Sequence, residues 1–210
     1  AAVKRTGWAL KYASEEWKRN EEVVLAAVQN DWRNQQYASK EWKENREIVL
    51  AAVQQNEWAL GCASSKLRGD KKFVLTAISV NEKALLHTAY ENQADKDFVV
   101  EAVQKNWQAL KYALEQWKED RNIVLAAVQQ NASALKYASE KLRRDRAFVL
   151  VAVQQNWRAL KYANDQMKRD IQVVIAAMKQ NIYALAYAAE ELQLDHGIVV
   201  EFVLRVGVGN

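Results

Sequence analysis

The chain has 210 residues, a mass of 24.1 kDa and a formal net charge of +4 at neutral pH. It contains no proline and only six glycines, and half of its residues are hydrophobic, a composition typical of a protein made almost entirely of helices. The single cysteine, Cys62, excludes an internal disulfide, and the small charge excess is far from that of a dedicated polyanion-binding protein.

The ends and the hydropathy of the chain give two further expectations. No apolar stretch reaches the roughly 18 residues that a membrane-spanning helix needs, and no signal peptide is recognisable, so we expect a soluble protein, intracellular or organellar. The opening residues, AAVKRTGWALKYA, match the interior of a later stretch, AAVQQNEWALGCA at 51–63. We therefore expect a fragment or a mature piece of a longer repeat protein.

The sequence repeats itself with a period of 25 residues. An internal period of this size is the signature of a repeat architecture, in which each copy is one supersecondary unit. The period gives eight copies without insertions, and the same valine recurs in all of them: Val24, Val49, Val74, Val99, Val124, Val149, Val174 and Val199.

Two polar positions divide each copy into two predicted helices of about ten residues. The first holds Asn or Asp just before an apolar stretch such as RNIVLAAVQQ, and it predicts a helix N-cap. Its members are Asn20, Asn45, Asp70, Asp95, Asp120, Asp145, Asp170 and Asp195. The second suits a tight turn, because Asn tolerates the left-handed conformation and can also cap the next helix. Its members are Thr6, Asp31, Asn56, Asn81, Asn106, Asn131, Asn156 and Asn181.

One continuous helix is the competing interpretation, because 25 residues are close to seven helical turns. On a continuous helix, however, Asn106 and Asn131 would fall inside the apolar stripe, at a cost of roughly 1 to 3 kcal/mol for each buried amide. The apolar stretch IVLAAV is also hydrophobic on all sides, which a two-stranded coiled coil does not need. Helical hairpins explain both observations.

The hairpins are expected to stack on one another. Leu110, Ala113, Leu114 and Trp117 have the spacing of one buried helix face. A tyrosine such as Tyr112 recurs on another face in six of the eight copies, which predicts packing against the adjacent copy. The predicted fold is all-α: a single α-solenoid domain over residues 1–210, built from about eight 25-residue helix-turn-helix hairpin repeats.

The strings ALKYASEKLRRDRAFVLVAVQQN and EVVLAAVQNDWRNQQYASKEWKENREIVLAAVQQN resemble the domain of unknown function 4116 tandem helical repeat family. The resemblance extends over all 210 residues. It implies a tandem helical repeat fold and brings no catalytic residues with it.

Residues for chemistry are sparse, and we expect no enzyme activity, no cofactor and no metal. The two histidines, His87 and His196, are more than 100 residues apart, and neither has a second ligand at metal-binding spacing. Cys62 and His87 occupy the tyrosine position of adjacent copies, but two ligands do not make a structural zinc site. The glycines Gly207 and Gly209 precede no helix that could bind phosphate.

RNA binding is the alternative function, because basic residues gather at the turns between copies. They are Lys18, Arg19, Arg68, Lys71, Lys72, Lys118, Arg121, Arg143, Arg144, Arg146, Lys168 and Arg169. Carboxylates are interleaved with them, whereas a binder with many phosphate contacts would present a continuous basic stripe. Nucleic acid is therefore the less favoured partner.

Protein contacts are predicted where a copy carries an apolar residue in place of a polar one. Trp17, Trp42 and Trp117 share a column with leucines and are predicted to pack in the core. Five other tryptophans lie near the turns, two of them where sister copies carry surface residues. The candidate partner-binding residues are Trp8, Trp58, Trp32, Trp107, Trp157, Leu86, Phe202 and Val206.

Two regions depart from the repeat. Copies three and four differ at Gly61, Cys62, Leu86, His87 and Asn92, which predicts a bend or a docking point. The last stretch, HGIVVEFVLRVGVGN, is more apolar than its equivalents, and an apolar end of a repeat array predicts that something covers it. The function expected is a non-enzymatic scaffold, adaptor or peripheral structural subunit that contacts protein partners in a larger assembly.

Overall fold

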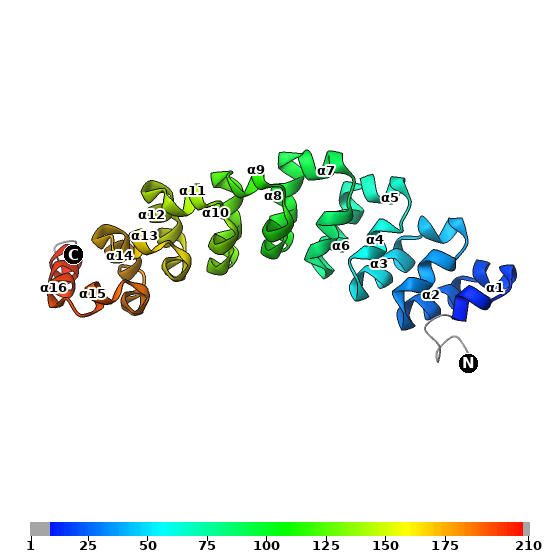
Figure 1. The fold of residues 1–210 in the computed structure, drawn as a ribbon, viewed down its shortest axis with the longest axis horizontal. Coiled ribbons are helices and arrows are strands. Elements are labelled where there is room, and N and C mark those ends of the chain that lie inside the picture. Colours follow the sequence, from blue (N-terminus) through cyan, green and yellow to red (C-terminus); the bar gives the residue numbers. More distant parts are fainter. Residues whose placement is uncertain (1–8, 208–210) are drawn as a thin grey trace. The chain divides into compact units, whose positions relative to one another are not determined.

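The computed structural model describes residues 9–207, and within that range the chain is helical and has no strand (Figure 1). The chain forms an all-α solenoid of tandem copies, as the sequence predicts. Its residues group into two compact units, Ala1–Ala113 and Leu114–Asn210. In each unit the long helices lie side by side in chain order.

The first unit holds four long α-helices and the short elements that connect them. In chain order its elements are η2 (Ala9–Tyr12), α1 (Glu15–Arg19), α2 (Glu21–Asn30), η3 (Trp32–Tyr37), η4 (Lys40–Lys43), α3 (Arg46–Gln55), α4 (Trp58–Gly61), α5 (Ser65–Gly69), α6 (Lys71–Val80), η5 (Glu82–His87), α7 (Tyr90–Ala94), α8 (Lys96–Lys105) and η6 (Trp107–Tyr112), where η marks a 3₁₀ helix.

The second unit repeats the same order. Its elements are α9 (Glu115–Lys118), α10 (Arg121–Gln130), η7 (Ala132–Tyr137), α11 (Glu140–Arg144), α12 (Arg146–Gln155), η8 (Trp157–Tyr162), α13 (Asp165–Lys168), α14 (Ile171–Met178), η9 (Ile182–Tyr187), α15 (Glu190–Gln193) and α16 (His196–Gly207).

The first predicted helix and its cap are confirmed for the copies of Asn20 through Asp170, whereas Asp195 accepts from the N–H of Gly197 at 2.7 Å. In α10, for example, Oδ1 of Asp120 accepts from the N–H of Ile123, the third residue of the helix, at 3.2 Å. This side-chain bond satisfies one of the N–H groups that a helix start leaves without a partner. The same bond, 2.9 to 3.2 Å long, begins the other long helices through Asn20, Asn45, Asp70, Asp95, Asp145 and Asp170.

The second predicted helix is wrong as a single ten-residue helix, because it is split into two short helices, in most copies a 3₁₀ helix followed by an α-helix. Between η7 and α11, Ala138 and Ser139 are both extended, with ψ of 152° and 153°. The freed N–H of Ser139 donates to the carbonyl of Lys118 in the preceding copy at 2.9 Å, and its hydroxyl caps α11. The break thus exchanges one bond within a helix for one bond between copies.

The split also corrects the predicted face of Leu110, Ala113, Leu114 and Trp117. Ala113 and Leu114 form the extended pair between η6 and α9, so these four residues do not share one helix. Leu110 and Ala113 are nevertheless buried, with 0% and 7% of their surface exposed. The apolar spacing therefore identified core residues while misjudging the backbone that carries them.

The turn asparagines cap the 3₁₀ helices and do not use the left-handed conformation. Asn131 is extended, with φ of −151° and ψ of 121°, and its Oδ1 accepts from the N–H of Ser133 at 2.9 Å. No non-glycine residue with positive φ occurs in the described part of the chain. Asparagine also supplies a donor, because Nδ2 of Asn81 reaches the carbonyl of Val53 in the preceding copy at 2.9 Å.

Packing joins neighbouring copies. Within each unit, elements that pack extensively belong to the same copy or to consecutive copies. The valine column from Val24 to Val174 is fully buried. The predicted contact of the tyrosines with the adjacent copy is confirmed in the second unit, where Ser133 Oγ donates to Tyr162 Oη at 2.8 Å and the ring of Tyr187 stacks on Trp157 at 5.8 Å.

We predict that Asp145→Ala lowers the free energy of unfolding by about 1 to 2 kcal/mol, because α12 loses its N-cap and Arg121 loses its ion-pair partner. Asp145→Asn is the matched variant, since asparagine caps the equivalent helices at Asn20 and Asn45. It should lose less than half as much in urea unfolding. Equal losses for the two variants would contradict a capping role.

Candidate interaction surfaces

A ladder of polar contacts joins the N-caps of consecutive copies. The residue after one cap binds the next cap: Arg46 pairs with Asp70, Lys71 Nζ lies 2.6 Å from Asp95 Oδ2, and two further pairs repeat the contact in the second unit, Arg121–Asp145 and Arg146–Asp170. Where the cap is an asparagine, the cap side chain is the donor and a carboxylate of the preceding copy is the acceptor. Nδ2 of Asn45 donates to Glu21 at 3.1 Å.

The helix N–H groups and the ladder together lower the pKa of four cap carboxyls, Asp70, Asp95, Asp145 and Asp170, below the ordinary value of 3.8. For Asp70 and Asp145 the largest cause is the backbone N–H of the third helix residue, which donates to the carboxylate, and the arginine adds to it. For Asp95 and Asp170 the largest cause is the bond from Lys71 or Arg146, to which the backbone bond adds. In all four, the folded state favours the charged form.

Most of the basic residues at the turns are already paired with carboxylates. Besides the ladder, the pairs join neighbouring side chains along a short helix or across to the next copy. Eight of the twelve cations named above have such a partner: Lys18, Lys71, Lys118, Arg121, Arg144, Arg146, Lys168 and Arg169. The turns therefore present alternating charges to solvent and not a basic stripe.

The candidate tryptophans differ in exposure. Trp58 exposes 60% of its surface, and its ring lies 4.6 Å from the ring of His87 at an angle of 44°. Trp32, Trp107 and Trp157 are half-buried beside the turns. Trp8 lies outside the described residues.

The prediction that Trp17, Trp42 and Trp117 pack in the core is wrong for Trp17, which is half exposed. Trp117 is only half-buried. Trp42 is half-buried, and its indole N–H donates to the carbonyl of Lys18 at 3.0 Å. Asn92 replaces the tryptophan in copy four, is buried, and donates to the equivalent carbonyl of Arg68 at 3.2 Å. Trp42 and Asn92 therefore make the same contact with the preceding copy through different side-chain N–H groups.

Copies three and four carry an exposed apolar group. Leu86 exposes 46% of its surface, and Tyr90, four residues later, exposes 69%. His87 packs opposite Gly61 and beneath Trp58, and burial lowers the pKa of its imidazole, an effect that the nearby Glu57 carboxylate partly offsets. Because the ring is in contact with Trp58, it acts as a support for an exposed aromatic side chain.

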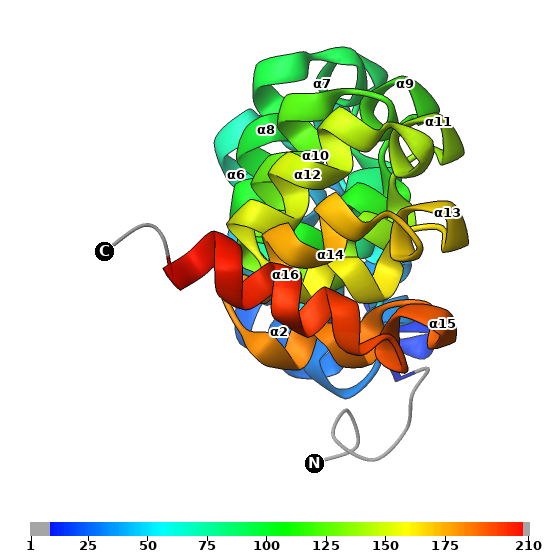
Figure 2. The ribbon, with the colours of Figure 1, turned by 90° about the vertical axis from the view of Figure 1, so that its left-hand side faces the viewer.

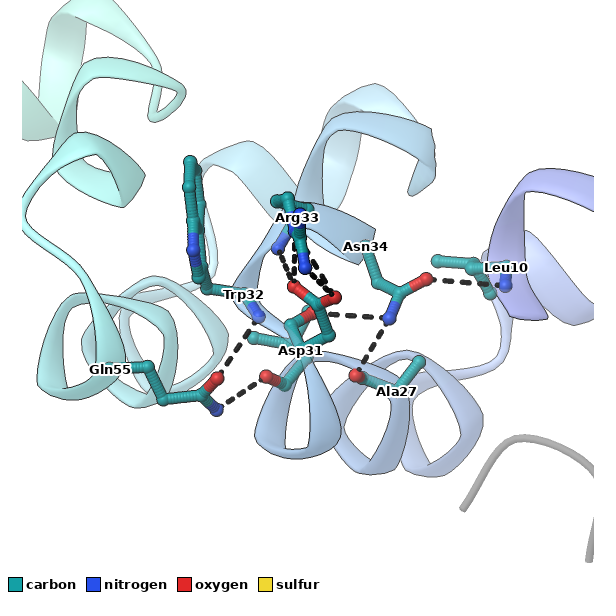
Figure 3. Close-up of polar contacts among 8 residues, drawn as sticks. Leu10, Ala27, Asp31, Trp32, Arg33, Asn34 and Gln55 are labelled. Carbon is teal, nitrogen blue, oxygen red and sulfur yellow. Dashed lines mark hydrogen bonds and ion pairs between the residues drawn. The ribbon is translucent and has the colours of Figure 1, made fainter. Parts of the chain in front are cut away.

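Copy two carries an unusual polar core, which the sequence analysis missed. Asn34 and Gln35 are fully buried where the other copies have Ala and Leu. Figure 3 shows how Asn34 is satisfied: Oδ1 accepts from the N–H of Leu10 at 3.3 Å, and Nδ2 donates to the carbonyls of Ala27 and Asp31. Gln35 has no hydrogen-bond partner for either amide atom. This polar core could have been found in the sequence, because Asn34 and Gln35 in the string NQQ stand at two adjacent positions where the other copies carry Ala and Leu.

The last described helix leaves an apolar face uncovered. α16 packs against α14, as Figure 2 shows from the side of α16. Ile198 of α16 is buried. Val200, Val203 and Leu204 expose about 60% of their surface, and Val199 exposes 41% although its equivalents are fully buried. Phe202 is half-buried, and Val206 lies in the last turns of α16.

The described residues contain no group of three or more side chains that could hold a metal ion. Over the same range, no helix is both long and apolar enough to cross a membrane.

Comparison with known proteins gives one kind of match. The family model described as "Domain of unknown function (DUF4116)" matches six segments, residues 1–43, 20–68, 45–93, 95–143, 120–168 and 145–193. Neighbouring segments overlap by about one copy, except for 45–93 and 95–143, and the model spans about two copies of the 25-residue repeat. No curated protein and no solved structure matches the chain.

We predict that Gln35→Leu raises the free energy of unfolding by about 1 to 3 kcal/mol, because it removes two buried polar atoms that have no partner. Leucine already occupies this position, fully buried, as Leu60 and Leu110. Gln36→Leu is the control, since Gln36 is exposed, and it should change stability by less than about 0.5 kcal/mol. A loss of stability for Gln35→Leu in urea unfolding would contradict the prediction.

The cap carboxyls predict a loss of stability in acid. Because their folded pKa values lie below 3.8, their contribution is fully present above that pH and is lost as pH falls through the lower folded values. Unfolding free energy should therefore fall as the pH is lowered below about 4. A variant with asparagine at Asp70, Asp95, Asp145 and Asp170 should fall less steeply, and parallel curves would contradict the assignment.

Proposed function

The chain belongs to the DUF4116 family, whose description assigns it no function, and we propose that this protein is a non-enzymatic repeat scaffold, an adaptor or peripheral structural subunit that contacts protein partners in a larger assembly. The observation that carries the proposal is a set of large apolar side chains, exposed at positions where sister copies carry charged or polar residues.

Trp58 illustrates this most clearly. Its column holds Arg33, Lys83 and Gln108 in three other copies of the first unit, whereas the ring of Trp58 is exposed and lies against His87. Leu86 likewise stands where Lys111 and Lys136 occur. Exposed aromatic side chains held rigidly by their neighbours are typical of the residues that dominate protein–protein binding energies.

The described part of α16 adds exposed apolar side chains in the second unit, namely Val200, Val203 and Leu204. Among them, Leu204 stands where the sister copies carry glutamine, serine or lysine. Burial of such side chains against a partner would be favourable at roughly 25 cal/mol for each Å² removed from water.

RNA binding, the alternative, gains little support from the turns. Binding to a nucleic acid through phosphates requires cations that can replace counterions along the backbone. The pairs between successive caps, such as Lys71–Asp95 and Arg146–Asp170, place a carboxylate beside each of these cations. The charge pattern therefore favours a protein partner over a polyanion.

The test replaces Trp58 and measures what the protein retains from its native extract. Wild-type chain should recover a defined set of proteins, and a photo-crosslinking residue at position 86 should identify the one in contact. Trp58→Gln, which copies the residue of the same column at Gln108, should weaken binding to that partner at least about tenfold.

Gln108→Ser is the matched control for that experiment, because Gln108 is exposed at the same position of another copy. It should bind the partner as the wild type does, and both variants should keep the wild-type unfolding free energy. The proposal fails if Trp58→Gln binds undiminished, or if the protein recovered from the extract is RNA-dependent and is lost on nuclease treatment.

A further inference from the structure

A cleft of about 330 Å³ lies in the second unit, along the successive 3₁₀ helices η7, η8 and η9. Its lining is polar, cationic and aromatic, and none of the described residues that line it carries a carboxylate. The lining residues are Gln130, Asn131, Ala132, Ser133, Asn156, Arg158, Lys161, Tyr162 and Tyr187.

Small residues open the cleft. Ala132 occupies a column in which other copies carry tryptophan or glutamate, as at Trp107 and Glu57. Ser133 occupies the next column, where Arg33 and Trp58 occur. The string NAS in copy six, in place of strings such as NWR or NEW, therefore removes two large side chains at one point on this face of the repeat.

Arg158 lacks the carboxylate that balances the cation of its column in other copies. Arg33, in the column of Arg158, is paired with Asp31 at 2.8 Å, and Lys83, in the same column, lies 3.4 Å from Glu57 of the preceding copy. For Arg158 the position of Glu57 is held by Ala132, and that of Asp31 by Asn156. Among the described residues, neither Arg158 nor Lys161 forms an ion pair.

Aromatic rings hold both cations in place. The guanidinium of Arg158 lies 4.4 Å from the ring centre of Trp157, which in turn stacks on Tyr187 at 5.8 Å. Lys161 Nζ lies 5.7 Å from the ring of Tyr162 and 5.9 Å from that of Tyr187. These contacts restrict the side chains without neutralising their charge.

Hydroxyl groups complete the lining. Ser133 Oγ donates to Tyr162 Oη at 2.8 Å, which leaves the phenol proton available to a further acceptor. Oδ1 of Asn131 and of Asn156 already accepts from a backbone N–H, so these carbonyl oxygens are engaged and do not repel an anion strongly. The groups directed at the cleft are thus two cations and a phenol donor.

We propose that this cleft binds a phosphate monoester. The dianion has three terminal oxygens, which can accept from Arg158, Lys161 and Tyr162 together, whereas a carboxylate has two. The aromatic rings of Tyr162 and Tyr187 can contact the group that carries the phosphate. The site does not depend on the proposed scaffold role.

The test titrates the purified chain with phenyl phosphate and follows backbone amide shifts by NMR. Saturable shifts of Ser133, Arg158, Tyr162 and Tyr187 are expected, with benzoate binding about tenfold more weakly because it carries one charge fewer. Inorganic phosphate is titrated in parallel. Weaker binding than phenyl phosphate would assign a role to the aromatic rings, and equal binding would assign recognition to the phosphate group alone. Both results support an oxyanion site.

Variants separate the site from the fold. Arg158→Gln and Lys161→Gln should each weaken binding about tenfold, and Ala132→Trp, which restores the residue of sister copies, should abolish it by filling the cleft. Lys136→Gln, at the column of Lys161 in the preceding copy and outside the lining, should bind as the wild type does.

Three results would overturn the proposal. They are the absence of a saturable shift with phenyl phosphate, undiminished binding by Arg158→Gln, and tighter binding at the same residues by a single-stranded oligonucleotide without a terminal phosphate. The last would make the cleft part of a nucleic-acid surface.

Discussion

The fold depends on the need to give every backbone N–H and carbonyl at the copy boundaries a hydrogen-bond partner. In the second half of each copy the chain leaves the helical conformation for two residues, and the amide released there reaches a carbonyl of the copy before it. The bonds from Ser39, Ser64, Ala89, Ser139 and Ala189 to the preceding copy all have this form. The turn asparagines and the indole of Trp42 add side-chain donors to the same junctions. Short helices, which are marginal alone, are thereby fastened to their neighbours.

Much of this fold could be predicted from the sequence, because its strongest signals are chemical and periodic. Asx residues before an apolar stretch gave the long helices and their caps, and the valine column gave the core. The split of the second helix was missed because Leu110, Ala113, Leu114 and Trp117 have helical spacing whether or not the backbone is continuous. The signal lay in Ser39, Ser64, Ser139 and Asn164, which precede the short elements as potential caps.

The candidate surfaces were harder to predict for a different reason. A tryptophan can lie in solvent, stack on a neighbouring copy or donate a hydrogen bond through its indole, and these outcomes depend on the adjacent copy and not on the residue. Trp58 is exposed, whereas Trp157 stacks on Tyr187 and Trp42 bonds to Lys18. The phosphate cleft was invisible for a related reason, since small residues at Ala132 and Ser133 carry no chemistry of their own and matter only through the space they leave.

The contacts between copies also constrain how this architecture can change. Each bond joins residues at a fixed offset along the chain: 21 for Ser139 and Lys118, 24 for Arg121 and Asp145, and 28 for Asn81 and Val53. A single-residue deletion within a copy would misalign all three kinds of bond at that junction, whereas substitutions leave the offsets intact. Such an array can lengthen or shorten by duplication or loss of whole 25-residue modules, so its genetic unit of growth coincides with its structural period.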